Sequence, residues 1–257
     1  VKAQTIVDIG GSTAGRSAVH NAILALLGNA TYAYDGTSSA SAATRAIYNG
    51  TYNGQTYTIR TYWGGSVQGI QQVRLGTQQT ELLDPSITGT TSGQSLGASG
   101  YSKAAASAAT AFEIGFSDVF ASTVAQTATD LEDEVAVIPF KWYANNGSTG
   151  ITNITPGLAR QLYSSGEAKK SLFTGNASDT GTVYYPVGRN SDSGTRAISM
   201  AECGYGNVAT VSQYAPTVTG SAVTALGNAT NSGYSSGGSL KTAMNSNYSG
   251  GMLIGYL

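Results

Sequence analysis

The sequence predicts an α/β fold, because apolar strand-like segments repeatedly end in a turn of Gly and Ser residues that leads into a helical segment. Such junctions lie near residues 10, 65 and 190. The 257 residues fit one large domain or two small ones. A hydrophobic fraction of 40% is enough for an ordinary core and separates the chain from disordered sequences.

The first junction is the clearest part of the pattern. Gln4 to Ile9 is apolar enough for a buried strand, and Gly10 to Thr13 turns the chain. Apolar residues then recur at helical spacing from Ala14 to about Leu27, where Gly28 provides a stop.

The later elements follow from the same reasoning. Alternation predicts a strand over 56–63, and a Gly-Gly-Ser turn then leads into a short helix through Ile70 and Val73. Residues 76–110 are rich in small polar residues and predict an exposed insertion. Thr155 before a proline predicts a capped helix. The other predicted strands are 111–116, 134–143, 183–188 and 252–257, and the other predicted helices are 103–110, 156–164, 220–226, 239–244 and one beginning at Arg196.

Charged residues are scarce in this chain. They make up 11% of it, against roughly 25% in typical globular proteins. The net charge is -1 without clusters of Lys and Arg, so we expect no nucleic-acid binding. No apolar run reaches the roughly 20 residues of a membrane span. The uncharged polar composition and the missing starting Met suit a secreted protein, periplasmic or extracellular, that has lost a signal peptide, and a trimmed chain fits equally.

The sequence carries no catalytic motif. His20 is the only histidine and Cys203 the only cysteine, which is too few for a zinc site. A nucleophile elbow, a phosphate-cradling P-loop and a His-Glu-x-x-His motif are all missing. The acidic run from Asp130 to Glu134 predicts a solvated loop, with a surface Ca²⁺ site as the alternative. We therefore expect no enzyme activity, no cofactor and no metal.

Small hydroxyl residues stand where predicted strands end. The positions are Ser12-Thr13, Ser66, Ser117-Asp118 and Ser193-Gly194-Thr195. The amino-terminal end of a helix leaves N–H groups unpaired and favours anions, and ligands of open α/β sheets lie beyond the carboxyl ends of strands. Converging junctions of this kind predict an oxyanion site made mostly of neutral dipoles. The alternative at each position is a plain helix cap.

One motif is more specific than the others. The arrangement Gly188-Arg189, three residues, then Ser193-Gly194-Thr195-Arg196 resembles the phosphate-binding proteins of phosphate ABC transporters, which are periplasmic substrate-binding proteins of the second topological type. Further segments resemble the family in the same order: Asp8–Thr13, Gly64–Ile70, Phe112–Asp118, Ile154–Gly166 and Gly251–Tyr256.

The resemblance implies two α/β lobes with a ligand cleft between them. Lobe one would hold residues 1–137 with the closing strand 252–257, and lobe two residues 138–251. Phosphate or a similar oxyanion would be the ligand, and the permease of an ABC transporter a partner. The implied ligand-binding residues are Thr13, Ser66, Asp118, Arg189, Ser193, Gly194 and Thr195.

Three departures from the family pattern favour a second function. Asp192 stands where the family has Gly, and it would repel an anion unless it turned away, for example to Arg196 at i+4. The segment between Ser66 and Ser117 is longer than in the family. The given sequence stops at Leu257, before the family's return segment, so either a tail is missing or the first lobe closes differently. The alternative is an extracellular structural, fibre-forming or adhesive protein that associates with itself through its terminal strands.

Overall fold

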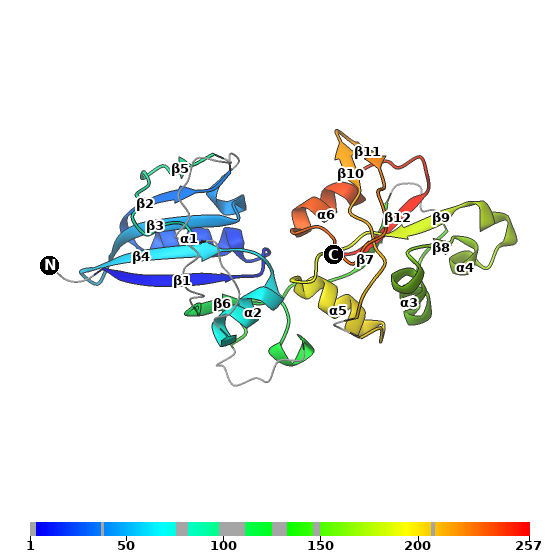
Figure 1. The fold of residues 1–257 in the computed structure, drawn as a ribbon, viewed down its shortest axis with the longest axis horizontal. Coiled ribbons are helices and arrows are strands. Elements are labelled where there is room, and N and C mark those ends of the chain that lie inside the picture. Colours follow the sequence, from blue (N-terminus) through cyan, green and yellow to red (C-terminus); the bar gives the residue numbers. More distant parts are fainter. Residues whose placement is uncertain are drawn as a thin grey trace. The chain divides into compact units, whose positions relative to one another are not determined.

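The computed structural model divides the chain into two compact units, Val1–Asp118 and Val119–Leu257, which are described separately below (Figure 1). Both units combine strands and helices, so the predicted α/β class is confirmed. None of the described helices is long and apolar enough to cross a membrane. The structure describes residues 4–36, 39–75, 82–97, 111–124, 133–145, 150–206 and 209–257.

Unit 1 contains a six-stranded sheet with the order β5-β2-β3-β4-β1-β6. Strand β1 lies between β4 and β6 and runs parallel to both, so the carboxyl ends of these three strands meet at one edge. The strands are β1 Thr5–Gly11, β2 Gly28–Tyr34, β3 Arg45–Tyr52, β4 Gln55–Tyr62, β5 Gln94–Ser95 and β6 Ile114–Phe116.

Two helices accompany this sheet, α1 at Arg16–Leu26 and α2 at Ser66–Leu75, with a 3-10 turn at Ala40–Ala42. The predicted apolar face of α1 is confirmed, because Val19 and Ile23 are buried in the core. The antiparallel strands β2 and β3 were not predicted. One core cluster of this unit consists of Ile9, Val19, Ile23, Leu27, Ala46, Tyr48, Ile59 and Trp63, and a second consists of Ala33, Ile47 and Leu83.

Glycines allow α2 to approach the ends of β1 and β6 closely. Gly11 has a φ of +118°, and a Cβ there would lie 2.0 Å from the carbonyl oxygen of Phe116. A Cβ on Gly69 would lie 2.6 Å from the Cα of Gly11. Only glycine fits both places, so this close packing sets the positions of the residues that follow β1 and β6.

A buried ion pair crosses the centre of the unit 1 sheet. Asp8 on β1 lies opposite Arg60 on β4 in the parallel register. The guanidinium donates from Nε to Oδ1 at 2.8 Å and from Nη2 to Oδ2 at 2.7 Å. Both residues are less than one-tenth exposed, and Glu113 accepts from the Asp8 N–H at 2.6 Å. The two charges therefore depend on each other for compensation.

Unit 2 is built on a four-stranded sheet with the order β7-β12-β9-β8. Its strands are β7 Trp142–Ala144, β8 Ala168–Lys169, β9 Val183–Pro186 and β12 Met252–Tyr256, with a separate hairpin of β10 Thr217–Thr219 and β11 Ala222–Ala225. The helices are α3 Pro156–Ser165, α4 Ser171–Thr174, α5 Gly194–Glu202 and α6 Gly237–Met244, and 3-10 turns lie at Ala121–Val124 and Ala177–Gly181.

Helix α3 shows most clearly how sequence sets an element. The Thr155 side chain accepts from the Leu158 N–H at 3.3 Å, as predicted for the cap. Gly166 ends the helix in the left-handed region with a φ of +78°. Ala159, Leu162 and Tyr163 are buried on its inner face. Both ends and one face of the helix therefore follow from local sequence.

The closing strand does not return to the first lobe. β12 lies between β7 and β9 in the sheet of unit 2, and its Leu253 is fully buried. The units divide after Asp118 and not at residue 137. The assignment of 252–257 to lobe one and the boundary at 137 are both corrected. Since β1 and β12 each have a strand partner on both sides, neither offers an open edge for strand exchange.

Two local predictions in unit 2 are also wrong. The apolar run over 134–143 forms a strand only from Trp142, and Val135 and Val137 before it are 77% and 80% exposed. The segment 220–226 is not a helix, because Gly220 turns the β10–β11 hairpin with a φ of +60° and β-branched residues follow. The predicted helix at 103–110 lies outside the described residues.

Replacing Asp8 with Ala should lower the free energy of unfolding of unit 1 by about 3–5 kcal/mol, because Arg60 would stay buried without its charge partner. Urea unfolding followed by circular dichroism measures the loss. Asp179→Ala is the control, since Asp179 pairs with Lys170 at 3.0 Å in a more exposed place and should shift the midpoint little. Equal shifts in the two variants would contradict the importance of the buried pair.

Candidate functional site

In unit 1 the predicted residues gather where parallel strands end. Ser12 directly follows β1, Asp118 follows β6, and Ser66 begins α2 after β4. Backbone bonds tie these ends together, with the Ser12 N–H donating to the Phe116 carbonyl at 2.7 Å and the Gly65 N–H to the Gly11 carbonyl at 2.9 Å. The polar residues of this edge are thus held by main chain.

Asp118 is the centre of this group. Its Oδ2 accepts from the Ser12 hydroxyl at 2.9 Å, its Oδ1 accepts from the Ser66 hydroxyl, and its N–H donates to Ser66 Oγ at 3.2 Å. Ser12 and Ser66 are 5% and 1% exposed. Each oxygen of the carboxylate therefore already holds one hydroxyl proton, and Thr13 lies half-buried beside Ser12.

In unit 2 the predicted motif spans the end of β9 and the start of α5. Ser193 occupies the cap position of α5 in an extended conformation, but its side chain makes no capping bond. Ser193 and Thr195 are 2% and 5% exposed. Within the part of the chain that the structure describes, neither hydroxyl makes a hydrogen bond to the protein.

The first turn of α5 adds backbone donors to these hydroxyls. The first intrahelical bond runs from the Ala197 N–H to the Ser193 carbonyl at 3.2 Å. The N–H groups of Gly194, Thr195 and Arg196 precede it and have no partner within the helix. Hydroxyl and N–H donors thus lie together at the positive end of a helix dipole, where an anion is favoured.

Arg189 is held by protein oxygens. Its Nε donates to the Tyr234 carbonyl at 3.0 Å and its Nη2 to the Ser235 carbonyl at 3.1 Å, and the residue is 5% exposed. Arg189 therefore also helps to hold Tyr234 and Ser235 in place. Direct contact between Arg189 and an anion stays a prediction.

Arg196 is a second buried cation. From the sequence, its only expected role was as a charge partner for Asp192. Its Nη1 donates to the Asn231 carbonyl at 2.6 Å and its Nη2 to the Ala209 carbonyl at 3.3 Å. Burial lowers the pKa of Arg196 below its ordinary value, and interactions with Tyr163 and Asp192 partly offset this. Its hydrogen-bond partners are neutral, so the charge is solvated by dipoles.

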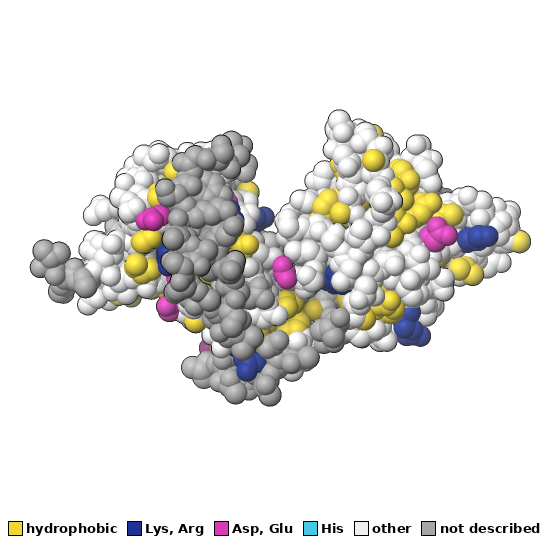
Figure 2. Space-filling model, in the orientation of Figure 1, with side chains coloured by type: hydrophobic (Ala, Val, Ile, Leu, Met, Phe, Trp, Pro, Cys, Tyr) yellow, Lys and Arg dark blue, Asp and Glu magenta, His cyan; other side chains and the backbone are white. Residues whose placement is uncertain are grey.

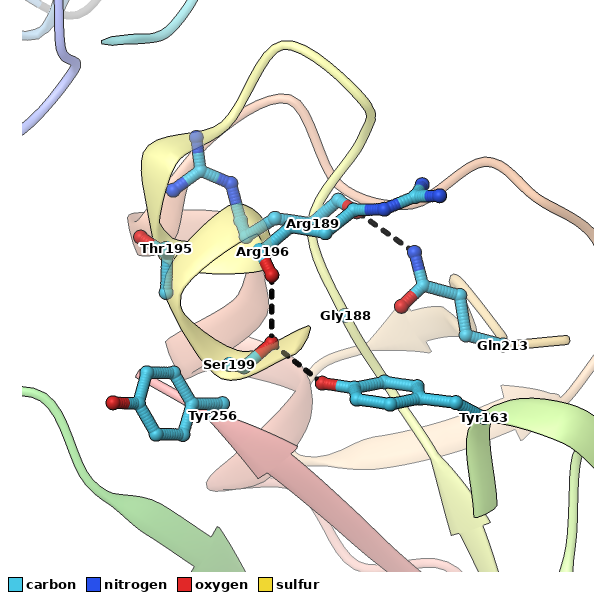
Figure 3. A pocket seen from close by; sticks show the side chains of 8 residues that line it. All are labelled: Tyr163, Gly188, Arg189, Thr195, Arg196, Ser199, Gln213 and Tyr256. Carbon is cyan, nitrogen blue, oxygen red and sulfur yellow. Dashed lines mark hydrogen bonds between the residues drawn. The ribbon is translucent and has the colours of Figure 1, made fainter. Parts of the chain in front are cut away.

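A small polar cavity lies against α5 (Figure 3). The two guanidinium groups of Arg189 and Arg196 point to opposite sides in this view, while Ser199 links the Tyr163 hydroxyl at 2.7 Å to the Arg196 carbonyl at 2.9 Å. The cavity measures about 10 Å³, which is room for one water at most. The cavity is therefore too small for a phosphate ion.

Other candidate groups have structural explanations or lie outside the description. His20 contacts Tyr48, with 3.0 Å between Nδ1 and the hydroxyl, and burial lowers the pKa of this histidine. The acidic run Asp130–Glu134 is described only from Asp133. Among the described residues, no group of three or more His, Cys, Asp or Glu side chains could hold a metal ion.

Comparisons of the chain with protein-family models, with curated proteins and with solved structures found no match.

Replacing Arg189 with Ala should lower the free energy of unfolding of unit 2 by about 2 kcal/mol, because the carbonyl oxygens of Tyr234 and Ser235 lose a charged donor that is itself buried. Thermal and urea unfolding measure the loss. Arg160→Ala is the matched control, since Arg160 is exposed and donates at 2.6 Å to the Cys203 carbonyl alone. A variant as stable as the parent would show that these two hydrogen bonds contribute nothing to the fold.

Proposed function

We propose that this chain is a secreted or periplasmic solute-binding protein that binds a small oxyanion, most simply phosphate, at the amino-terminal end of α5 and catalyses no reaction. The observation that carries the proposal is the pair of hydroxyls on the largely buried residues Ser193 and Thr195, which have no partner within the described protein. Neither hydroxyl oxygen is among the described buried atoms that lack a partner, so both reach the surface, where they can donate to an external acceptor.

The electrostatics of α5 support an anion over a neutral ligand. The helix dipole places positive potential at Gly194, and the buried Arg196 adds a full positive charge whose hydrogen-bond partners are neutral oxygens. Ser193 does not cap the helix, so its hydroxyl can donate to a ligand without loss of an existing bond. Asp192 acts against an anion, and its attraction to Arg196 limits that effect.

The proposal includes residues of unit 1 because the family resemblance assigns ligand-binding residues there. Thr13, Ser66 and Asp118 are the ligand-binding residues that the resemblance assigns there. Since both carboxylate oxygens of Asp118 already accept hydroxyl protons, the serines orient it as an acceptor for a ligand that carries a proton. Phosphate and arsenate carry such a proton near neutral pH and sulfate does not. An ABC transporter permease is the partner that this function implies.

Calorimetric titration with phosphate, arsenate and sulfate tests the proposal. Phosphate at a hundredfold excess over its Kd should raise the free energy of unfolding by about 2.7 kcal/mol and raise the melting temperature accordingly. Sulfate should bind more weakly than phosphate if Asp118 reads the ligand proton. Flat titrations with all three anions would overturn the proposal.

Ser193→Ala and Thr195→Ala should each weaken phosphate binding by about ten- to a hundredfold, because each removes one hydrogen bond to a charged group. Ser193→Ala should leave stability nearly unchanged, since no cap is lost. Ser236→Ala is the matched control: the Ser236 hydroxyl accepts from the Ser239 N–H at 3.1 Å, so its loss should cost about 1 kcal/mol of stability and leave binding intact. The reverse pattern would make Ser193 an ordinary cap.

A further inference from the structure

Three tyrosines form a second polar-aromatic group in unit 2, which we call the tyrosine cluster: Tyr185, Tyr214 and Tyr248. The ring of Tyr185 lies 5.5 Å from Tyr214 with an interplanar angle of 84°, and 6.1 Å from Tyr248 with an angle of 70°. All three side chains are half-buried, so each keeps part of its surface open to a ligand. The rings of Tyr214 and Tyr248 therefore both stand nearly perpendicular to the ring of Tyr185.

Local backbone makes room for these rings. A Cβ on Gly251 would lie 2.8 Å from Cε2 of Tyr185, and one on Gly250 would lie 2.6 Å from the Tyr248 hydroxyl. The Tyr214 N–H donates to the Pro186 carbonyl at 2.9 Å, which places Tyr214 alongside the end of β9. Figure 2 shows hydrophobic side chains gathered on the surface over β9 and β12.

A carboxylate lies beside the tyrosine cluster. β8 pairs antiparallel with β9, with Ala168 opposite Tyr184, so the next pair in this register sets Glu167 opposite Tyr185. Side chains in such positions have Cβ atoms about 5 Å apart. Burial raises the pKa of Tyr185 and of Tyr214 above the ordinary value, and the charge of Glu167 raises both further. The exposed Glu167 thus contributes negative charge beside the cluster.

We propose that the tyrosine cluster and Glu167 bind an organic ammonium group, such as a trimethylammonium head. The face of an aromatic ring carries partial negative charge, and perpendicular rings with a carboxylate suit a compact cation with methyl groups on several sides. A sugar would fit less well, because it stacks on one broad, open aromatic face, and the perpendicular rings of the tyrosine cluster restrict access to such a face. The exposed Lys169 faces Val183, two pairs along the ladder from Tyr185. This site is independent of α5 and of the oxyanion proposal.

Titration of the whole chain with tetramethylammonium chloride and with choline chloride tests this site, followed by calorimetry and tyrosine fluorescence at constant ionic strength. Both cations should give saturable binding. The neutral tert-butyl isostere of choline should bind about tenfold more weakly, because it lacks the cation–π and carboxylate attraction. Binding of the neutral isostere with equal affinity, or of a neutral oligosaccharide in place of the cations, would overturn the proposal, as would the absence of saturation.

Variants locate the response within the molecule. Glu167→Gln and Tyr214→Ala should each weaken binding of tetramethylammonium by about five- to tenfold. The controls are Glu134→Gln and Tyr143→Ala, which make the same changes at exposed positions outside the cluster and should leave the affinity unchanged. Glu167 is exposed, so its variant keeps the fold, and an unchanged affinity in Glu167→Gln would by itself exclude the proposed site.

Discussion

The candidate site depends on the segment Asn231–Ser235, whose oxygen atoms bind both buried guanidinium groups of unit 2. Arg189 donates to the carbonyls of Tyr234 and Ser235, and Arg196 donates to Asn231. Gln213 extends the network, donating to the Ser232 carbonyl at 2.8 Å and to the Arg189 carbonyl at 2.7 Å. Because these bonds anchor both sides of the β9–α5 connection, α5 keeps its position without a capping bond from Ser193, and its first-turn donors stay open.

The fold could be predicted where local sequence decides it. The strand before Gly10, the apolar face of α1 and both ends of α3 follow from periodicity and capping within a few residues. The β3–β4 hairpin could also be predicted, because an Asn-Gly pair such as Asn53-Gly54 favours a tight hairpin turn. The two residues have the positive φ values that this turn requires, +49° and +74°. The place of β12 could not be read locally, since its partners β7 and β9 lie 66 or more residues earlier in the chain.

The sequence predicts which residues belong to the candidate site, but it does not predict which hydrogen bonds they make. Hydroxyl residues after strands are visible in sequence, and Ser12, Ser66 and Asp118 do meet. What the sequence cannot show is that the carboxylate already holds two hydroxyls, because Ser66 and Asp118 are 52 residues apart. The hydrogen bonds of Arg189 could not be predicted either, since the carbonyls that accept them lie 45 and 46 residues away in the chain. Long-range partners decide whether a polar residue is available to a ligand.

The scarcity of charge makes the environment of each buried arginine informative. In unit 1, Arg60 lies against the carboxylate of Asp8, and the pair is compensated where it stands. In unit 2, Arg196 is 7% exposed and its hydrogen bonds go to uncharged oxygens of Asn231 and Ala209. Dipoles lower the cost of burying that charge without cancelling its field. The field remains at the end of α5, where the helix dipole has the same sign. Under the proposed function, a bound anion would compensate this charge and accept from the hydroxyls of Ser193 and Thr195 and from the open N–H groups of the first turn.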